Sequence, residues 1–371
     1  MSEEKVNGRQ VVQNIFGVQK EEEMKKLDQF FADLSKVDKE NAVPRGRVAN
    51  VFVVLLAEGE LVIRHEGGED VTLASLDGDK YPMILHEKLV SAWRRQTLEV
   101  LRSDYDAHRA EINKVLGKDE KYQWHCSLRP TQTVKESAKG KTIEEKLGGL
   151  CRECPNCMIF GFAVGKEETF NLKSRIEGDV YLATVPEKKS VVVRTFNAVD
   201  EVTHTTFIEG EGERTGALFR LSLIRVGTPF VGKIAMKDLS YAEFALALYS
   251  LAVTSRVGGI KSDFGRIKVI IPAVAFCDHE VGSGYEMFQQ VKGVENVSEI
   301  VRKVNEYAKT FGKECRVFTS EDFAPKVIEL VSKNKHDVVK EAWENGLNFK
   351  KGIEEFISST DKEGRKSRQK A

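Results

Sequence analysis

The sequence predicts an α+β fold with insertions, not a regular doubly wound sheet. Stretches with strand composition and stretches with helical periodicity occur along the whole chain, but they do not alternate as repeated βα units would. The 371 residues correspond to two or three domain-sized units. With 41% hydrophobic and 31% charged residues, the chain has enough apolar material for a core, which argues against a solenoid or a disordered protein.

The N-terminal part contains two expected helices and two expected strands. Residues 20–35 carry apolar side chains at helical spacing and predict an amphipathic helix. The continuous, β-branched run Val48–Ala57 is typical of a central strand covered on both faces. A second strand is expected over residues 61–64, and a long helix with a solvated face over residues 87–116.

The second half of the chain is richer in expected strands. Ser240 is a suitable N-cap for a helix over residues 241–254, because Glu243 completes a capping box. Residues 285–360 have a mostly helical pattern, and a frayed basic tail follows them. The expected strands are 180–183, 191–195, 219–224 and 267–275.

These elements divide the chain into five units. The insertion is set apart because it holds four of the six cysteines. The units are an N-terminal core part with a helical insertion (1–120), a zinc-binding insertion (121–175), core strands with a hairpin and a glycine-rich loop (176–284), a helical C-terminal part (285–360) and a basic tail (361–371).

Charge and cysteine content restrict the classes of function. Lys+Arg and Asp+Glu both total 57, so a nucleic-acid site would have to be a local basic patch. The N-terminus has no apolar segment like that of a signal peptide, and no apolar run is long enough to span a bilayer, so we expect a soluble, cytoplasmic protein without membrane contact. Six cysteines are too few for a disulfide framework, and Cys277 and Cys315 are expected to be isolated, buried small residues.

The strongest local motif is Cys151-Arg-Glu-Cys154-Pro-Asn-Cys157, preceded by Cys126. Four thiolates can bind zinc tetrahedrally, so a structural zinc ion is the predicted cofactor, with His125 as the possible substitute for Cys126. An iron–sulfur cluster and unligated or oxidised thiols are the alternatives. A site closed by four protein ligands would stabilise the insertion and would not catalyse a reaction.

A second motif is the glycine-rich basic run over residues 256–268, after the expected helix. Its glycines would let backbone N–H groups approach a phosphate closely. Phe264 could stack on a base or anchor the loop, and the whole run could equally be a tight helix-to-strand turn with solvated charges. The candidate phosphate-binding residues are Arg256, Gly258, Gly259, Lys261, Arg266 and Lys268.

A third motif, residues 196–219, has two β-rich arms around a polar middle, as in a protruding hairpin. It carries Asn197 and His204, of which His204 taken alone is an ordinary exposed histidine. Two glycine-containing runs, 161–167 and 210–216, lack the spacing or the charge of a nucleotide site. We find no Ser/His/Asp arrangement, HExxH motif or paired carboxylates that indicate a catalytic centre.

Taken together, three stretches resemble the backbone subunits of CRISPR interference complexes, in the RAMP superfamily with an RRM-like (ferredoxin-like) core. The segments 197–200, 214–219 and 227–230 look like the family's thumb and return segment. Residues 256–266 are similar to its glycine-rich RNA-binding loop, and Cys126 with residues 151–165 looks like the zinc-binding insertion of the type I-D branch.

The resemblance implies a non-catalytic, multi-copy protein that binds guide CRISPR RNA and presents it for pairing with target DNA. Its other partners would be copies of itself and the remaining subunits of the type I-D effector complex. The loop cations and amides would hold the guide phosphates, and a β-hairpin thumb around 197–216, which carries Asn197 and His204, would push between the bases. Arg45 and Arg47 are further candidates on the same surface.

Two other hypotheses follow from the same features. A metal-dependent nuclease on this scaffold would cut the paired target strand at regular intervals, and Glu66, Glu69 and Asp70 are acids near the second expected strand that could serve it. The other hypothesis is a zinc-ribbon nucleic-acid protein unrelated to CRISPR. Three acids in a short loop are usually just solvated, so we assign no catalytic residue.

Overall fold

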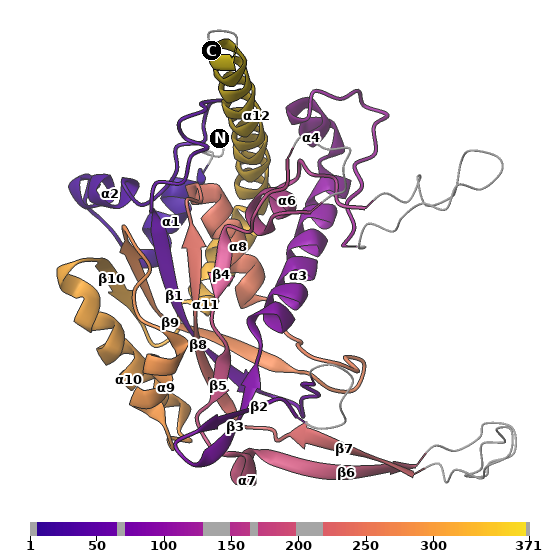
Figure 1. Cartoon of the computed structure of the whole chain (residues 1–371), viewed down its shortest axis with the longest axis vertical. Helices are drawn as coiled ribbons and strands as arrows, with labels where there is room; N and C mark the ends of the chain where they lie inside the picture. The colour runs from indigo at the N-terminus through magenta and orange to yellow at the C-terminus, as the bar shows by residue number, and fades with distance from the viewer. Residues whose placement is uncertain (1–5, 65–70, 129–148, 164–169, 198–217, 369–371) are drawn as a thin grey trace, which may run out of the picture.

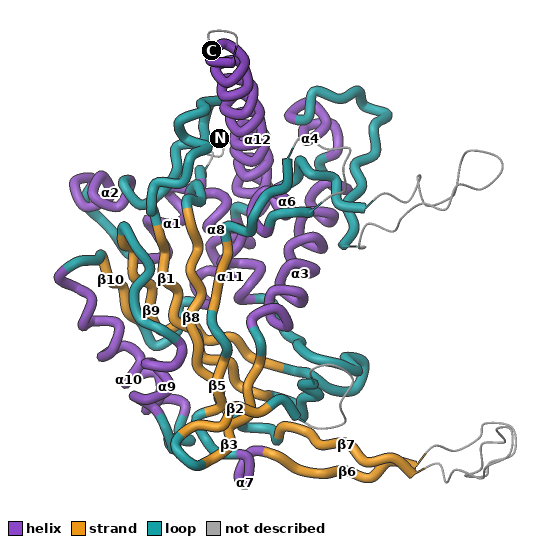
Figure 2. Tube along the Cα trace, in the orientation of Figure 1, coloured by secondary structure: helices purple, strands orange, loops and turns teal. Residues whose placement is uncertain are grey.

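The computed structural model describes residues 6–64, 71–128, 149–163, 170–197 and 218–368 (Figure 1). It confirms the α+β class, with a central antiparallel sheet and a helical C-terminal part (Figure 2). The sheet has eight strands in the order β10-β9-β1-β8-β5-β3-β2, and β4 pairs with β8 beside this path. Its strands are β1 (Val48–Ala57), β2 (Leu73–Leu76), β3 (Asp79–Ile84), β4 (Ile176–Gly178), β5 (Tyr181–Ala183), β8 (Pro229–Lys237), β9 (Ile267–Cys277) and β10 (Arg316–Thr319).

The central strand β1 is covered on both faces, as its continuous apolar run predicts. Val51, Val53 and Leu55 belong to the larger hydrophobic core, whereas Phe52 and Val54 belong to a second core on the opposite face. Helices on the first face are α1 (Gly8–Phe16), α3 (His86–Ala107), α8 (Tyr241–Ala252), α11 (Ala324–Lys333) and α12 (Lys335–Arg368). On the second face lie α9 (Gly284–Val291), α10 (Val297–Lys309) and the 3-10 turn η1 (Thr310–Lys313).

Several predicted elements have different bounds in the structure. The helix expected over 20–35 is confined to α2 (Glu21–Asp28), because the chain then turns to place its apolar side chains against the core, and the Ala32 amide donates to the Leu239 carbonyl. The expected strand 61–64 is reduced to an isolated bridge between Leu61 and Ile224. In these segments tertiary contacts outweigh the local pattern.

The long helix expected over 87–116 is two helices, α3 and α4 (Arg109–Val115). They are separated at His108, whose φ of −128° is not helical. The tail expected to fray is the end of α12, which continues to Arg368. The capping box at α8 is confirmed, since the Glu243 amide donates to Ser240 Oγ over 3.3 Å and the Ser240 amide donates to Glu243 Oε2 over 3.0 Å.

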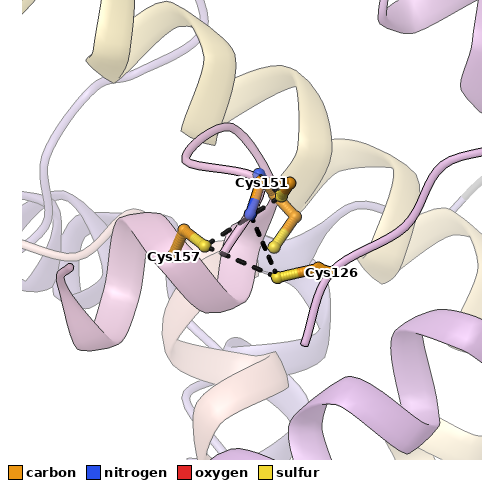
Figure 3. A group of neighbouring side chains, drawn as sticks. Cys126, Cys151 and Cys157 are labelled. Atoms are coloured by element: carbon orange, nitrogen blue, oxygen red, sulfur yellow. Dashed lines mark hydrogen bonds between the residues drawn. The ribbon is translucent and has the colours of Figure 1, made fainter. Parts of the chain in front are cut away.

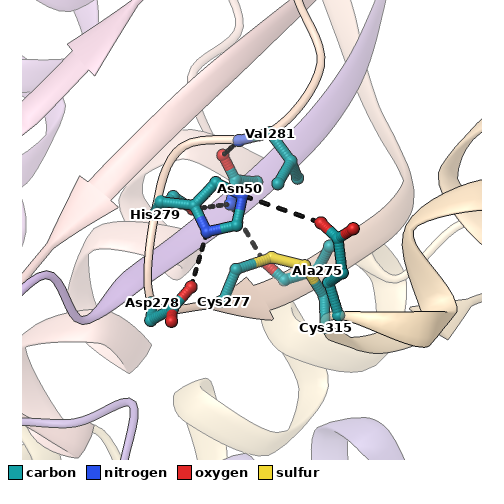
Figure 4. The surroundings of a disulfide bond; sticks show 8 residues. Asn50, Ala275, Cys277, Asp278, His279, Val281 and Cys315 are labelled. Atoms are coloured by element: carbon teal, nitrogen blue, oxygen red, sulfur yellow. Dashed lines mark hydrogen bonds and ion pairs between the residues drawn. A yellow bond between two sulfur atoms is a disulfide. The ribbon is translucent and has the colours of Figure 1, made fainter.

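Cys277 and Cys315 are joined by a disulfide, so the prediction that they are isolated is wrong (Figure 4). Both are buried, as expected, but the pairing of β9 with β10 brings them together. Arg316 lies opposite Phe276 in the antiparallel register, so Cys315 and Cys277 are next in line, with their Cα atoms 4.7 Å apart. Because 38 residues separate them in sequence, local pattern alone does not reveal the pair.

Thiol counting tests this assignment. In denaturant with a chelator present, we expect four reactive thiols per chain before reduction and six after it, because four of the six cysteines are free in the structure. Counting by a colorimetric thiol reagent is sufficient. Six thiols before reduction in protein purified without reductant would contradict the disulfide.

Among the described residues, no helix combines the length and the apolar composition that a membrane span requires.

Candidate metal centre and nucleic-acid interface

The four cysteines of the insertion converge on one point. Figure 3 shows Cys126, Cys151 and Cys157 facing one another. The four sulfur atoms all lie within 4.8 Å of one another, with 3.7 Å between Cys126 and Cys157 and 4.0 Å between Cys151 and Cys157. Cys126, Cys154 and Cys157 are fully buried, and Cys151 is half-buried. His125 is exposed and lies outside the group, which favours Cys126 as the fourth ligand.

The chain around the cysteines is shaped to present sulfur atoms. Cys154 is the N-cap of α6 (Pro155–Phe160), Pro155 starts that helix, and Cys157 lies on its first turn. Arg152, in the middle of the Cys-x-x-Cys turn, has a positive φ of 63°. Backbone amides point at the sulfurs: that of Cys151 donates to Cys126 Sγ over 3.4 Å and that of Cys154 to Cys151 Sγ over 3.3 Å.

This geometry can hold one metal ion and is consistent with zinc. A tetrahedral ion with Zn–S bonds of about 2.3 Å separates its ligand sulfurs by about 3.8 Å, close to the two distances observed. A cluster with an inorganic core between the thiolates would hold them further apart. Burial and hydrogen bonding to Cys126 and Cys151 raise the pKa of Cys154 well above its usual value, so thiolate at this position needs a bound cation.

The cysteine cluster is packed into the body of the protein. Trp124 donates its Nε1–H to Cys151 Sγ over 3.3 Å and meets Trp343 of α12 edge to face, with ring centroids 5.0 Å apart. Arg175 donates to the Met158 carbonyl of α6 over 2.9 Å and forms a bidentate ion pair with Glu243 of α8. The cluster therefore connects α6 to both α8 and α12.

Glu243→Gln is expected to lower the free energy of unfolding by about 3 kcal/mol, because it leaves the buried Arg175 charge without its partner. Chemical denaturation measures the change. Glu329→Gln is the matched control: its carboxylate is exposed and pairs with Lys333, so we expect a change below about 0.5 kcal/mol. Equal effects of the two substitutions would contradict the structural role of the buried pair.

The glycine-rich loop at 256–268 is held in shape by one of its own cations. Nη1 of Arg256 donates to the carbonyls of Lys261 and Phe264, both over 2.7 Å, so this guanidinium braces the loop. Gly258 has a φ of +90°, and a Cβ there would lie 2.4 Å from the Val62 carbonyl oxygen. The Gly259 amide donates to that same oxygen over 2.9 Å, so Gly259 would contribute shape to a binding surface and not an N–H donor.

Two of the remaining cations of the loop are exposed and the third is half-buried. Arg266 is 53% exposed and has a 3.4 Å contact with Glu58, and Lys268 is exposed. Lys261 is half-buried, and burial together with the nearby charge of Arg95 lowers its pKa. Two cations held close together favour binding of an anion.

Arg95 is the candidate that sequence reasoning missed. It lies on α3, 166 positions before Lys261 in sequence, and its side chain is exposed. The sequence pattern of a long helix does not show which residue lies opposite a charged side chain on its polar face. Only the packing of α3 beside the loop reveals the pair.

The strands expected over 191–195 and 219–224 are confirmed as β6 (Val191–Asn197) and β7 (Leu218–Ile224), which form an antiparallel hairpin separate from the main sheet. It projects from the body of the molecule (Figure 1). The hairpin contacts the loop and the turn after β1: Phe196 meets Phe264 edge to face at 6.0 Å, and Arg194 pairs with Glu60 at 2.7 Å. The hairpin and the loop therefore form one continuous surface.

Other predicted site residues do not join this surface. Arg45 and Arg47 precede β1, and the loop adjoins the other end of that strand, since Val48 pairs with Cys277 and Ala57 with Ile267. Ten strand residues separate the two ends by about 30 Å. The prediction that these arginines lie on the surface of the loop is therefore wrong.

The two arginines also have partners of their own. Arg47 is 12% exposed and pairs with Asp238 at 2.8 Å, which makes it a structural residue. Arg45 is exposed and pairs with Glu40 at 3.0 Å.

Some predictions lie outside the described residues. These are His204 and the hairpin segment 198–216, the acids Glu66, Glu69 and Asp70, and most of the run 161–167. Asn197 is the last described residue of the first hairpin strand.

Comparison with known proteins identifies the family. A family model described as Csc2 Crispr matches residues 30–364, and a search of curated proteins finds no match. The crystal structure of Thermofilum pendens Csc2 shares 20% identity at a TM-score of 0.64, covering 89% of this chain and 94% of that one.

Two further solved structures are more distant. One, described as "CRISPR RNA-guided surveillance complex, pre-nicking", has 9% identity and a TM-score of 0.46 over 77% of this chain and 100% of that one. The other, "CRISPR RNA-guided surveillance complex", has 10% identity and a TM-score of 0.41 over 72% and 84%. Because the family model spans most of its length, the chain belongs to the Csc2 CRISPR family and has its role in CRISPR defence.

Proposed function

We propose that this protein is a non-catalytic, multi-copy backbone subunit of a type I-D CRISPR interference complex. It binds guide CRISPR RNA along its phosphates in the cytoplasm and presents it for pairing with target DNA. The observation that carries the proposal is the single surface formed by the glycine-rich loop, the adjacent cations and the base of the projecting hairpin.

The strand connections support an RRM-like core. In chain order, β1, α3, β5, β8, α8 and β9 form a β-α-β-β-α-β unit, and the four strands lie in the order β9-β1-β8-β5. The hairpin β6–β7 is inserted between β5 and β8, and the cysteine-containing segment lies between α3 and β5. Both insertions thus lie between elements of the same β-α-β-β-α-β unit.

The sheet itself is closed to RNA. RRM proteins usually stack bases on aromatic side chains of the open sheet face. Here Phe52 on that face is fully buried beneath Tyr307 and Phe311. Nucleic-acid contact is therefore expected at the loop and hairpin, where recognition relies on phosphates and shape.

Binding to phosphates without reading bases suits a protein whose sequence specificity comes from the guide. Arg266, Lys268 and Lys261, joined by Arg95, would supply the charge, and the Gly258 amide, which has no backbone acceptor in the described part of the chain, would supply an N–H donor. The exposed hairpin residue Val193 would take part in separating bases. His204 and Asn197 remain candidate contacts on the hairpin.

Zinc in the cysteine cluster would be structural. The four ligands close the coordination sphere, and the cluster connects α6 to α12 and α8. Equal numbers of acidic and basic residues suit a subunit that stacks on copies of itself, with acidic surfaces facing basic ones. Copies of itself and other subunits of the effector complex are accordingly proposed as partners.

Co-expression with a guide RNA tests this function. We expect the purified protein to elute in size-exclusion chromatography as a multi-copy species with strong nucleic-acid absorbance. Labelled target strands incubated with the complex and Mg²⁺ should stay intact. Discrete, regularly spaced products would instead support the nuclease hypothesis, and elution as an RNA-free monomer would contradict the proposal.

A further inference from the structure

A second group of metal-ligating side chains lies away from the cysteine cluster, where α3, α4 and α12 meet. It consists of Asp104, His108 and His336, whose ligand atoms lie within 4.8 Å of one another. Asp104 is on the last turn of α3, His108 separates α3 from α4, and His336 is on the first turn of α12. The three residues come from segments 228 positions apart in sequence, so the fold has brought them together.

Both histidines present a ring nitrogen to the same carboxylate. Nδ1 of His336 lies 3.1 Å from Asp104 Oδ2, and Nδ1 of His108 lies 3.3 Å from Asp104 Oδ1. Atoms that ligate one zinc ion tetrahedrally through bonds of about 2.0–2.1 Å are about 3.3 Å apart. Both nitrogen–oxygen distances are close to this separation.

Asp104 has a buried carboxylate oxygen without a hydrogen-bond partner among the described residues, and a cation could bind it. Its side chain is 0% exposed, and its Oδ1 accepts no hydrogen bond from any described residue, although it points at His108. The Nδ1 atom of His108 also lies 3.2 Å from the Asp104 carbonyl oxygen, so it faces two oxygen atoms of the same residue. A buried carboxylate oxygen without a partner costs about 1–3 kcal/mol or more, which binding of a cation would remove.

The neighbours of His336 favour the tautomer in which Nδ1 can bind a metal ion. Its Nε2 lies 3.4 Å from Glu111 Oε2, and Glu111 is itself held by Lys340 at 2.8 Å. A carboxylate that accepts the Nε2 proton leaves the Nδ1 lone pair directed at Asp104, as in carboxylate–histidine–zinc arrangements. Two facing lone pairs need a cation or a proton between them.

Protonation of both histidines would compensate the Asp104 charge less well than one metal ion would. The imidazole rings of His108 and His336 stack with centroids 3.6 Å apart, so two imidazolium ions would place like charges in contact. One divalent ion would serve both neutral rings and the carboxylate at once. The histidines are 37% and 22% exposed, so solvent water can reach the site and would be the fourth ligand.

We propose that Asp104, His108 and His336 form a second zinc-class metal site that joins the α3–α4 junction to the start of α12. It is independent of the cysteine cluster and of RNA binding. The nitrogen and oxygen ligand set, with one open position, distinguishes it chemically from the four-thiolate site.

Cobalt substitution tests the proposal with a readout for each site. The full-length protein is stripped of metal, loaded with Co²⁺ and desalted, and bound cobalt is measured by mass spectrometry alongside the absorption spectrum. We expect two equivalents in the wild type and one in His336→Ala, with the thiolate-to-cobalt charge-transfer band unchanged. His279→Ala, which removes an exposed histidine beside Asp278, is the matched control and should retain two equivalents.

The number of bound cobalt ions and the charge-transfer band together show which of the two sites binds metal. One equivalent in the wild type together with the charge-transfer band would overturn the proposal, as would two equivalents in His336→Ala. One equivalent without that band would uphold this site and contradict the cysteine site instead. If His336→Ala does not fold, as judged by circular dichroism, Asp104→Asn supplies the same test, because it removes the ligating charge while keeping the volume of the side chain.

Discussion

Cys154→Ser is expected to release the metal of the cysteine cluster and to lower the free energy of unfolding by about 5 kcal/mol or more. Cys154 is fully buried and caps α6, so a serine there leaves a weaker ligand in a dry site. The remaining three thiolates would be close together without full compensation of their charge. Loss of the ion should also loosen the contacts of α6 with α12 and α8.

Metal content and thermal unfolding of the purified variant measure this effect. His125→Ala is the matched control, because this exposed histidine is adjacent to Cys126 but lies outside the ligand group. The control should keep its metal and its unfolding temperature. A wild type that is folded without metal, or a Cys154→Ser protein of unchanged stability, would refute a structural metal at this site.

Replacing Arg95, Lys261 and Arg266 together with glutamine is expected to weaken binding of unrelated RNA sequences equally, by about 100-fold at 0.1 M salt. Each lost phosphate contact reduces the slope of log K against log salt by about 0.7 for a single strand, so three contacts reduce it by about 2. Arg256 is left unchanged because it braces the loop. If it were replaced, weaker RNA binding could result from a changed loop conformation and not from a lost phosphate contact.

A charge-matched control removes the same number of cations elsewhere. Lys309, Lys313 and Arg316 are exposed on or next to α10 and η1, near the end of β9 that is distant from the loop. Their replacement with glutamine should leave the salt slope within error of the wild type. Fluorescence anisotropy titrations at several salt concentrations provide the comparison. A slope that changes equally in both triple variants would show that only net charge matters.

The sequence predicted best where local chemistry dominates. The β-branched run Val48–Ala57 is β1 with those bounds, because a strand buried on both faces has no polar alternation to confuse its reading. The Ser240–Glu243 capping box and the four-cysteine group were likewise found, since each has a spacing fixed by hydrogen-bond or ligand geometry. These features depend on few long-range contacts.

The predictions from sequence were wrong where a contact depends on strand register or on helix packing. The Cys277–Cys315 disulfide follows from the pairing of β9 with β10, which no local pattern announces. Arg47 and Arg256 were both read as free cations, yet one pairs with Asp238 and the other braces its own loop. A positive charge in a sequence does not show whether the fold has already supplied its partner.

Residues that meet only through packing were also missed. Arg95 and Lys261 are brought together by the position of α3 beside the loop, and His108 and His336 by the contact of α3 and α4 with α12. Each belongs to a helix or loop whose own pattern is ordinary. The sequence shows which residues are charged or can bind a metal. Only the three-dimensional structure shows which of them lie next to each other.

Photo-crosslinking of the guide RNA complex, read out by mass spectrometry, tests the central claim most directly. We predict crosslinked nucleotides on the loop at 256–268, including Phe264, and on the strands of the hairpin, in particular Val191–Asn197. Crosslinks concentrated on the helices α9 and α10 that cover the second face of the sheet, or the absence of crosslinks from the loop, would contradict the account.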